Sequence, residues 1–204
     1  MLNVGLTGGI ASGKSTVARM LVEKGALLID LDELAHEIEA PGGGVWRGIV
    51  RHFGKGVLNA DRTIDRKKLG AIVFADPSRL RLLNELVHPA VFEAWRGRLR
   101  EICGISPAAI VLSAVPLLIE AGMVEAVDLI LLVYLPREKQ ISRLMRRNGY
   151  SRDEAEARIA SQMPIEEKMP YADIIVNNAG SEKETERALT AIWEDLKKRE
   201  KNAR

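Results

Sequence analysis

The chain has 204 residues, of which 47% are hydrophobic and 28% charged, as is typical of a globular domain, so bulk disorder is excluded. Its 30 basic and 28 acidic residues nearly cancel, and composition therefore gives no indication of nucleic-acid binding. The single cysteine, Cys103, excludes an internal disulfide. The apolar runs are too short to span a membrane, and the sequence shows no secretory signal pattern. We therefore expect a soluble cytoplasmic protein.

Strand-like and helix-like segments alternate along the chain. An apolar run over 2–7 ends in glycines, and residues 16–24 then place apolar side chains at helical spacing up to Gly25. Four further runs have the length of buried strands: 26–30, 109–114, 129–135 and 173–176. A closing amphipathic helix is expected over 189–198, with a frayed tail after it. Continuous apolar runs predict an α/β fold with a parallel sheet of about five strands flanked by helices.

Two regions interrupt this alternation. No strand is evident between residues 41 and 105, where helical patches cover 66–74 and 80–87. The second region, 137–170, is rich in arginine and helix formers and is broken at Asn148-Gly149. Both regions are predicted to be helical additions to the sheet.

Residues 8–15 read Gly-Gly-Ile-Ala-Ser-Gly-Lys-Ser and match the phosphate-binding loop G-x-x-x-x-G-K-[ST] between a strand and a helix. Glycines let consecutive backbone amides surround phosphate oxygens, and the following helix N-terminus adds positive potential. Lys14 is expected to neutralise the β- and γ-phosphates, and Ser15 to ligate Mg²⁺. The alternative is a glycine-rich turn with an exposed lysine. The motif in this context predicts a nucleoside triphosphate site.

Carboxylates close the second predicted strand at Asp30 and Asp32. In a parallel sheet the carboxyl end of a strand faces the ligand crevice, so either group could accept a proton from an acceptor hydroxyl or hold metal-bound water. The alternative is that Asp32 only caps the next helix. The chain lacks the Asp-x-x-Gly and Asn-Lys-x-Asp motifs of GTPases, which excludes that class.

Arginines four residues apart, Arg143 and Arg147, share one face of a predicted helix. Guanidinium groups on a mobile segment can close over phosphate oxygens as charge develops on them, which favours a lid. The alternative is a solvated face balanced by nearby acidic residues.

Further motifs follow the loop in a distinctive order: Asp30-Leu31-Asp32 with His36, Arg66, His88-Pro89, Val115-Pro116-Leu117-Leu118 with Glu120, Arg143 with Arg147, Arg158 with Gln162, and Asp173 through Asn178 and Gly180. Together with the loop they resemble the dephospho-coenzyme A kinase family. Ala11 stands where that family usually has glycine, so the loop backbone is expected to avoid strongly positive φ there.

The resemblance implies a three-part P-loop kinase. The core would comprise 1–40, 106–136 and 171–204, with a helical substrate-binding region over 41–105 and a lid over 137–170. Such an enzyme transfers the γ-phosphoryl group of ATP to the ribose 3′-hydroxyl of dephospho-CoA, the last step of coenzyme A synthesis. The alternatives are another small P-loop kinase, for a nucleoside monophosphate or small alcohol, and a non-catalytic nucleotide sensor.

The resemblance also implies roles for single residues. Asp32 becomes the base or metal-side carboxylate, Ser15 and Asp32 the Mg²⁺ side, and Arg143 and Arg147 would face the ATP phosphates. The nucleotide would contact Gly9, Ala11, Ser12, Gly13, Lys14, Ser15, Thr16, Asn178 and Gly180. The acceptor side would include Asp32, Arg66, His88, Pro89 and Glu120. The alternatives are that His88-Pro89 only begins a helix and that Glu120 is a solvated helix residue. The implied partners are small molecules, without nucleic acid or membrane.

Overall fold

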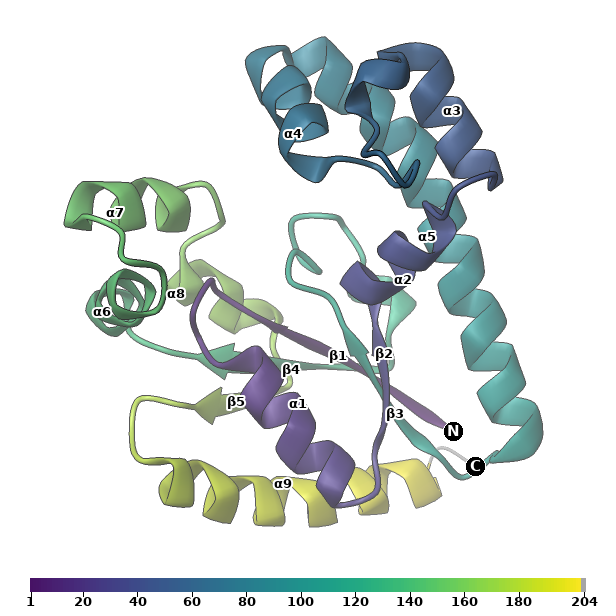
Figure 1. Cartoon of the computed structure of the whole chain (residues 1–204). Coiled ribbons are helices and arrows are strands. Elements are labelled where there is room, and N and C mark those ends of the chain that lie inside the picture. Colours follow the sequence, from purple (N-terminus) through teal and green to yellow (C-terminus); the bar gives the residue numbers. More distant parts are fainter. Residues whose placement is uncertain (203–204) are drawn as a thin grey trace. The chain divides into compact units, whose positions relative to one another are not determined.

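The computed structural model, which describes residues 1–202, contains a five-stranded sheet (Figure 1). Its strands in spatial order are β2 (Leu27–Asp30), β3 (Ile110–Ala114), β1 (Leu2–Gly8), β4 (Leu129–Tyr134) and β5 (Ile174–Asn177). β1 pairs in parallel with both β3 and β4, and β4 pairs in parallel with β5. The predicted α/β fold is confirmed, and the phosphate-binding loop leaves the central strand.

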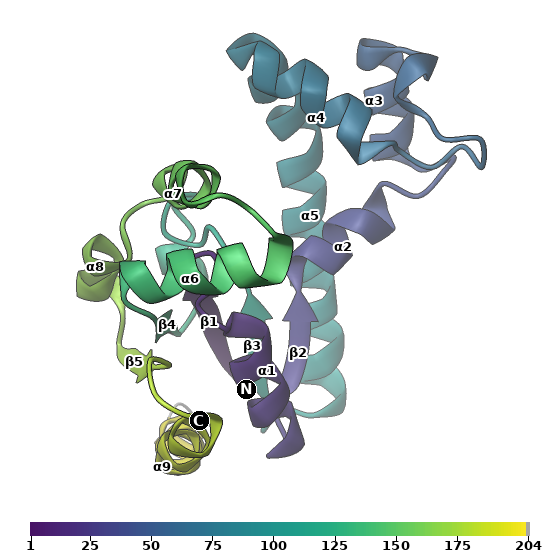
Figure 2. The same cartoon turned by 60° about the vertical axis from the view of Figure 1, so that its left-hand side comes forward.

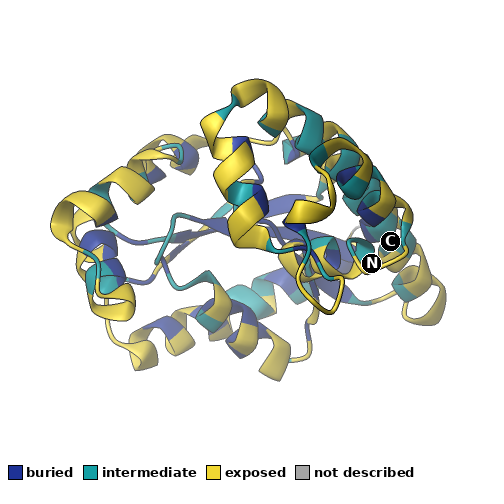
Figure 3. Ribbon diagram, turned by 45° about the horizontal axis from the view of Figure 1, so that its top comes forward, coloured by how far each residue is buried: buried dark blue, intermediate teal, exposed yellow. Residues whose placement is uncertain are grey.

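The three inner strands are buried along almost their whole length because both of their faces are covered. Val4, Leu112 and Leu131 are fully buried, and the strands stand out as buried against helices with exposed outer faces (Figure 3). Gly5 is required by this packing, since a Cβ there would lie 2.6 Å from Leu118 Cδ1. The phosphate-binding loop therefore follows a strand that is buried along its whole length.

The second strand differs from the expectation of a buried run over 26–30. Leu27 and Leu28 are 41% and 42% exposed, and only Ile29 in β2 is buried. The prediction of burial is wrong because β2 takes an outer position in the sheet, beside β3 alone.

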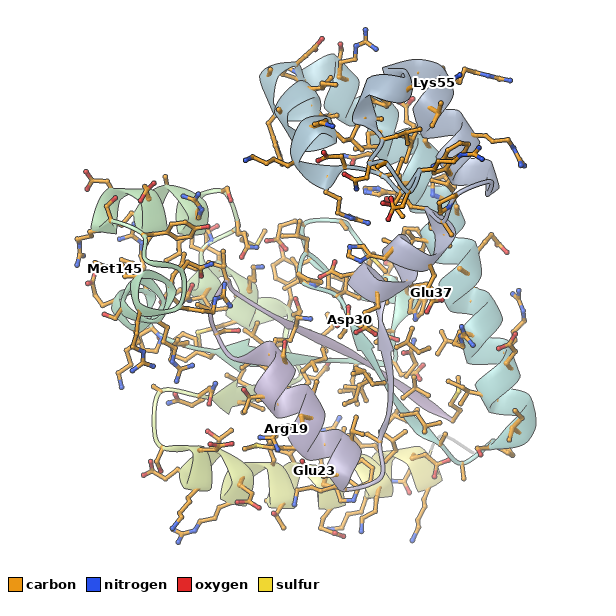
Figure 4. The ribbon with its side chains drawn as sticks, in the orientation of Figure 1. Arg19, Glu23, Asp30, Glu37, Lys55 and Met145 are labelled. Carbon is orange, nitrogen blue, oxygen red and sulfur yellow. The ribbon has the colours of Figure 1, made fainter. Side chains whose placement is uncertain are left out.

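The chain divides into two compact units, Met1–Ile29 with Ile102–Arg204, and Asp30–Glu101. The first unit contains the sheet and five helices: α1 (Lys14–Glu23), α6 (Arg137–Asn148), α7 (Arg152–Ala160), α8 (Ile165–Lys168) and α9 (Glu182–Asn202). Arg19 on α1 pairs with Glu23 at 2.7 Å, labelled in Figure 4, and with Glu182 at 3.0 Å. The second ion pair joins α1 to the start of α9, and Figure 2 shows the two helices on the same side of the sheet.

The second unit is helical. Its helices are α2 (Leu31–Ile38), α3 (Gly44–Phe53), α4 (Arg66–Ala75) and α5 (Pro77–Ile105), whose last turn belongs to the first unit. A short 3-10 helix, Lys55–Val57, also lies in this unit, whereas the 3-10 helices Val124–Ala126 and Met169–Tyr171 belong to the first unit. The hydrophobic core of the second unit includes Trp46, Ile49 and Leu69. An isolated antiparallel β-bridge joins Leu58 and Ile64. Within residues 1–202, no helix has both the length and the apolar character needed to cross a membrane.

The last helix is longer than the sequence predicted. It begins at Glu182, where Glu184 N–H donates to Ser181 Oγ at 3.3 Å and Ser181 N–H donates to Glu184 Oε2 at 2.7 Å. This reciprocal pairing lowers the pKa of the Glu184 carboxyl. The helix continues to Asn202, so the expectation of a frayed tail after residue 198 is wrong up to that point, and the rest of the tail lies outside the described residues.

Candidate functional site

The loop between β1 and α1 presents unpaired backbone donors. α1 begins after Gly13, whose φ of 95° is left-handed, and no side chain caps the helix. Within residues 1–202 the amides of Lys14, Ser15 and Thr16 donate to no protein acceptor. Free N–H groups at the start of a ten-residue helix, with the helix dipole behind them, form a site for an anion.

The glycines of the loop are explained by close approaches. A Cβ on Gly13 would lie 2.1 Å from Asn178 Nδ2, and one on Gly8 would lie 2.8 Å from the Val133 carbonyl oxygen. A Cβ on Gly9 would lie 3.0 Å from Gln140 Oε1. The loop is therefore packed against β4, α6 and the turn after β5.

Ala11 corrects an expectation. Its φ is 59°, so the prediction that the backbone avoids positive φ at this position is wrong. The left-handed region costs a non-glycine residue roughly 1–2 kcal/mol. Two features hold it there: Ser12 N–H donates to the Gly9 carbonyl at 3.1 Å, and Ala11 packs beside Ile10 against the buried residues of α6 and α7.

The carbonyl of Ser12 receives two donors from distant segments. Asn178 Nδ2 donates to it at 2.7 Å and Arg143 Nη1 at 3.3 Å. Arg143 Nη2 also donates to the Asn178 carbonyl at 2.9 Å, and Thr185 Oγ1 donates to Asn178 Oδ1 at 2.9 Å. Asn178 is thus buried and tied to the loop, and Thr185, which the sequence did not indicate, orients its carboxamide.

Three polar groups of the loop are uncommitted. Lys14 Nζ makes no ion pair or hydrogen bond in the described part of the chain, and the Ser15 side chain is exposed. Ser12 Oγ is buried and has no partner among the same residues. A cation, a hydroxyl and free amides side by side suit a polyphosphate accompanied by a hard metal ion.

The arginine-rich helices pack on this loop through apolar side chains. Ile141 and Leu144 of α6 and Ala155 of α7 form a buried cluster with Ile10 and Ala11 packed against it. The apolar faces of α6 and α7 therefore pack against the phosphate-binding loop.

The arginines of this segment separate into different environments. Arg143 contacts the loop, whereas Arg147 donates from Nε to Asn148 Oδ1 at 2.8 Å and is exposed. Arg152 pairs with Glu138 at 2.9 Å and with Glu156 at 2.7 Å, which is the charge-balanced surface that the alternative described. The structure brings Arg143 alone of these three to the loop.

Glu120 lies in a turn after β3 and not in a helix, although the residue as a whole is exposed, as the alternative expected. Its side chain is 21% exposed and lies 2.7 Å from Lys168 Nζ, and Glu120 Oε1 accepts from the Met163 amide at 3.2 Å. The neighbouring Gln162 accepts from the Ile10 amide at 3.0 Å. No sequence signal indicated Lys168, which is fully buried.

The aspartate that caps helix α2 is Asp30 and not Asp32. Asp30 is the N-cap of α2 and accepts from the Asp32 amide at 2.9 Å, so the alternative that Asp32 caps the helix is wrong. The Asp32 carboxylate is exposed and has no partner within residues 1–202. It is therefore free to interact with a ligand.

The remaining predicted residues belong to the helical unit. Arg66 opens α4 and pairs with Glu39 at 2.6 Å. Burial raises the pKa of the Glu39 carboxyl, against the opposing charges of Arg66 and His36. His88 and Pro89 are exposed in the interior of α5, so the alternative that they begin a helix is wrong.

Comparison with known proteins decides the family. A family model described as dephospho-CoA kinase matches residues 2–184. The chain belongs to the dephospho-CoA kinase family. The motif-based resemblance is thereby confirmed, and the protein is an enzyme, a P-loop kinase.

Similar proteins span nearly the whole chain. The dephospho-CoA kinase of Syntrophus aciditrophicus (strain SB) is 59% identical over 201 residues, which cover 98% of this chain and 86% of that protein. The dephospho-CoA kinase of Geobacter metallireducens is 50% identical over 204 residues, covering both chains completely. A solved structure, dephospho-CoA kinase from Campylobacter jejuni, is 30% identical with a TM-score of 0.72, covering 96% of this chain and 97% of that one.

Proposed function

We propose that this protein transfers the γ-phosphoryl group of ATP to the ribose 3′-hydroxyl of dephospho-CoA and releases CoA and ADP. The observation that carries the proposal is a phosphate-binding loop with free amides and an unpaired lysine in a member of the dephospho-CoA kinase family. The substrate assignment follows the names of the relatives, and the loop supplies the chemistry.

The nucleotide would bind along the loop and the turn after β5. The free amides of Lys14, Ser15 and Thr16 would donate to the phosphates, and Asn178 with Gly180 would lie near adenine. Lys14 would place its ammonium group on the β- and γ-phosphates, because it has no competing carboxylate among the described residues. Mg²⁺, when bound, neutralises charge on phosphate oxygens.

The residues that would hold the metal are Ser15 and Asp32. Ser15 offers an exposed hydroxyl at the start of α1, and Asp32 offers an unpaired carboxylate. Hydroxyl and carboxylate oxygens are suitable ligands for this ion.

Charge that develops on the transferring group needs fixed cations. Arg143 is held by the Ser12 and Asn178 carbonyls, so its guanidinium group is oriented before a ligand arrives. Arg147 is exposed on α6, one helical turn after Arg143, and would face the ATP phosphates. Asp32 would receive the proton of the attacking hydroxyl, and Arg66, His88 and Pro89 would contribute to acceptor binding.

The test is an acceptor panel. Purified protein with Mg·ATP is offered dephospho-CoA, AMP, GMP, dTMP and shikimate in parallel, ADP release is followed, and the product is identified by mass spectrometry. We expect turnover with dephospho-CoA and a product phosphorylated on the ribose 3′-hydroxyl. Turnover with another acceptor alone would indicate a different small-molecule kinase, and ATP binding without any turnover would indicate a sensor.

The Lys14→Ala variant links that activity to the loop. Losing one transition-state charge partner should lower turnover by on the order of 10²–10³ while leaving the fold intact. Lys197→Ala is the matched control, because that lysine lies on α9 in an exposed pair with Glu194. Near-normal turnover by folded Lys14→Ala protein would contradict the role of the loop.

A further inference from the structure

The link between α7 and α8, residues 161–164, is held from two sides. Gln162 Oε1 accepts from the Ile10 amide of the phosphate-binding loop at 3.0 Å. The next residue, Met163, donates its amide to Glu120 Oε1 at 3.2 Å, on the turn after β3. Gln162 and Met163, which are adjacent in this link, therefore connect the phosphate-binding loop after β1 to the Glu120 carboxylate in the turn after β3.

That carboxylate is paired with a buried lysine. Lys168 Nζ lies 2.7 Å from Glu120 Oε1, and the lysine side chain is completely buried while that of Glu120 is 21% exposed. Lys168 Nζ makes no aligned hydrogen bond within the described residues, so the ion pair is its single polar interaction. Burying such a pair is costly, and apolar residues of similar volume often stabilise a fold as well or better. Stability alone therefore does not account for a lysine here.

We propose that Lys168 is a positioning residue for phosphoryl transfer. Its charge fixes Glu120, Glu120 fixes the Met163 amide, and this sets Gln162 so that its oxygen orients the Ile10 amide. The inference rests on the proposed function, in which that loop seats the phosphates of ATP. It assigns Lys168 and Gln162 to the nucleotide side of the reaction.

The apolar packing of the loop does not make this hydrogen bond redundant. Ile10 and Ala11 rest on the cluster around Leu144, which fixes where their side chains lie. The amide plane of Ile10 adjoins Gly9, a residue with wide conformational freedom, and so needs its own constraint. Small displacements of groups around a reacting phosphate are expensive in rate, so losing the constraint should be measurable.

The test compares Lys168→Met and Gln162→Met, which keep side-chain length and remove the charge or the acceptor. Each should lower kcat, and raise the Kd for a non-hydrolysable ATP analogue, by about 3- to 10-fold, the effect of one hydrogen bond. The KM for dephospho-CoA should stay within about 2-fold, because the chain acts on the nucleotide side. Lys197→Met on the exposed face of α9 is the control and should match the wild type.

The double variant separates positioning from a purely structural role. If Lys168 acts through Gln162, the Lys168→Met/Gln162→Met protein should be no worse than Gln162→Met alone. Multiplying losses, or Lys168→Met values equal to those of the control, would overturn the inference. If Lys168→Met does not fold, Glu120→Gln carries the same comparison, and a rise in acceptor KM alone would then place Glu120 on the substrate instead.

Nucleotide affinity keeps the two proposals distinct. A wild-type protein that binds the ATP analogue but does not phosphorylate dephospho-CoA would refute the proposed function. The Kd values of the single and double variants for the ATP analogue would still decide the role of Lys168. These values are measured by titration calorimetry, which needs no acceptor.

Discussion

Replacing Gly13 by alanine should destabilise the protein because two costs coincide at one backbone position. The φ of 95° is left-handed, which costs an L-residue roughly 1–2 kcal/mol. The new Cβ would also lie 2.1 Å from Asn178 Nδ2, so the carboxamide must move away from the Ser12 carbonyl and from Thr185 Oγ1. Two lost hydrogen bonds contribute about 2 kcal/mol together. We expect a total loss of roughly 3–4 kcal/mol in the free energy of unfolding.

Gly25 is the matched control, since its φ of 112° is also left-handed. A Cβ there would meet a ring carbon of Trp193 at 3.6 Å, which is ordinary contact, so Gly25→Ala should cost only the roughly 1–2 kcal/mol of strain. Urea unfolding of both variants measures the difference, provided that the slope with denaturant is unchanged. Equal losses would refute the reasoning that Asn178 and Gly13 are in obligatory close contact.

The further predictions concern Asp30, Asp32 and Arg147 of the site and Glu184 at the start of α9. Asp30→Ala should lose the N-cap of α2 and destabilise by about 0.5–2 kcal/mol in thermal unfolding, whereas Asp32→Asn should change stability by less than about 1 kcal/mol. Asp32→Asn should nevertheless lower kcat by roughly 10²-fold or more, and full activity would mean that this carboxylate takes no part in the chemistry. Arg147→Ala should lower kcat more than it raises the acceptor KM, and an increase in KM alone would assign Arg147 to acceptor binding. The pKa of Glu184 lies below its ordinary value of 4.5, so the folded protein binds fewer protons than the unfolded chain there and stability falls as pH drops through that range. Glu184→Gln should flatten this acid-side loss in unfolding measured against pH, and an unchanged slope would contradict the assignment.

Local signals sufficed for the sheet and for the loop. Apolar runs predicted the bounds of every strand to within about two residues. The three inner strands are buried on both faces and so have no polar side to obscure the run. The loop was predicted because phosphate binding demands particular residue types at fixed spacing. The capping box at Ser181 and Glu184 was equally readable and would have placed the start of α9 correctly.

Contacts between distant segments were beyond such signals. Nothing near Thr185 or Lys168 in the sequence says that one orients Asn178 and the other pairs with Glu120, because each contact exists only after the sheet has formed. The alternative that His88-Pro89 begins a helix was also wrong, because Pro89 lies inside α5. Its missing hydrogen bond costs a helix about 3 kcal/mol, yet the 29-residue helix α5 continues through it. The local preference of proline therefore did not set a boundary of α5.

The bond between Asn178 and the Ser12 carbonyl joins positions 166 residues apart, and this has a consequence for synthesis of the chain. The ribosome releases the phosphate-binding motif long before its partners Asn178 and Thr185. A nascent chain that already displays residues 8–15 still lacks the groups that shape Ser12, and it lacks β4, one of the two strands flanking β1, until residue 134. We therefore expect that nucleotide cannot act as a folding template during translation, and that a chain truncated before Asn178 would bind ATP weakly despite carrying the complete motif.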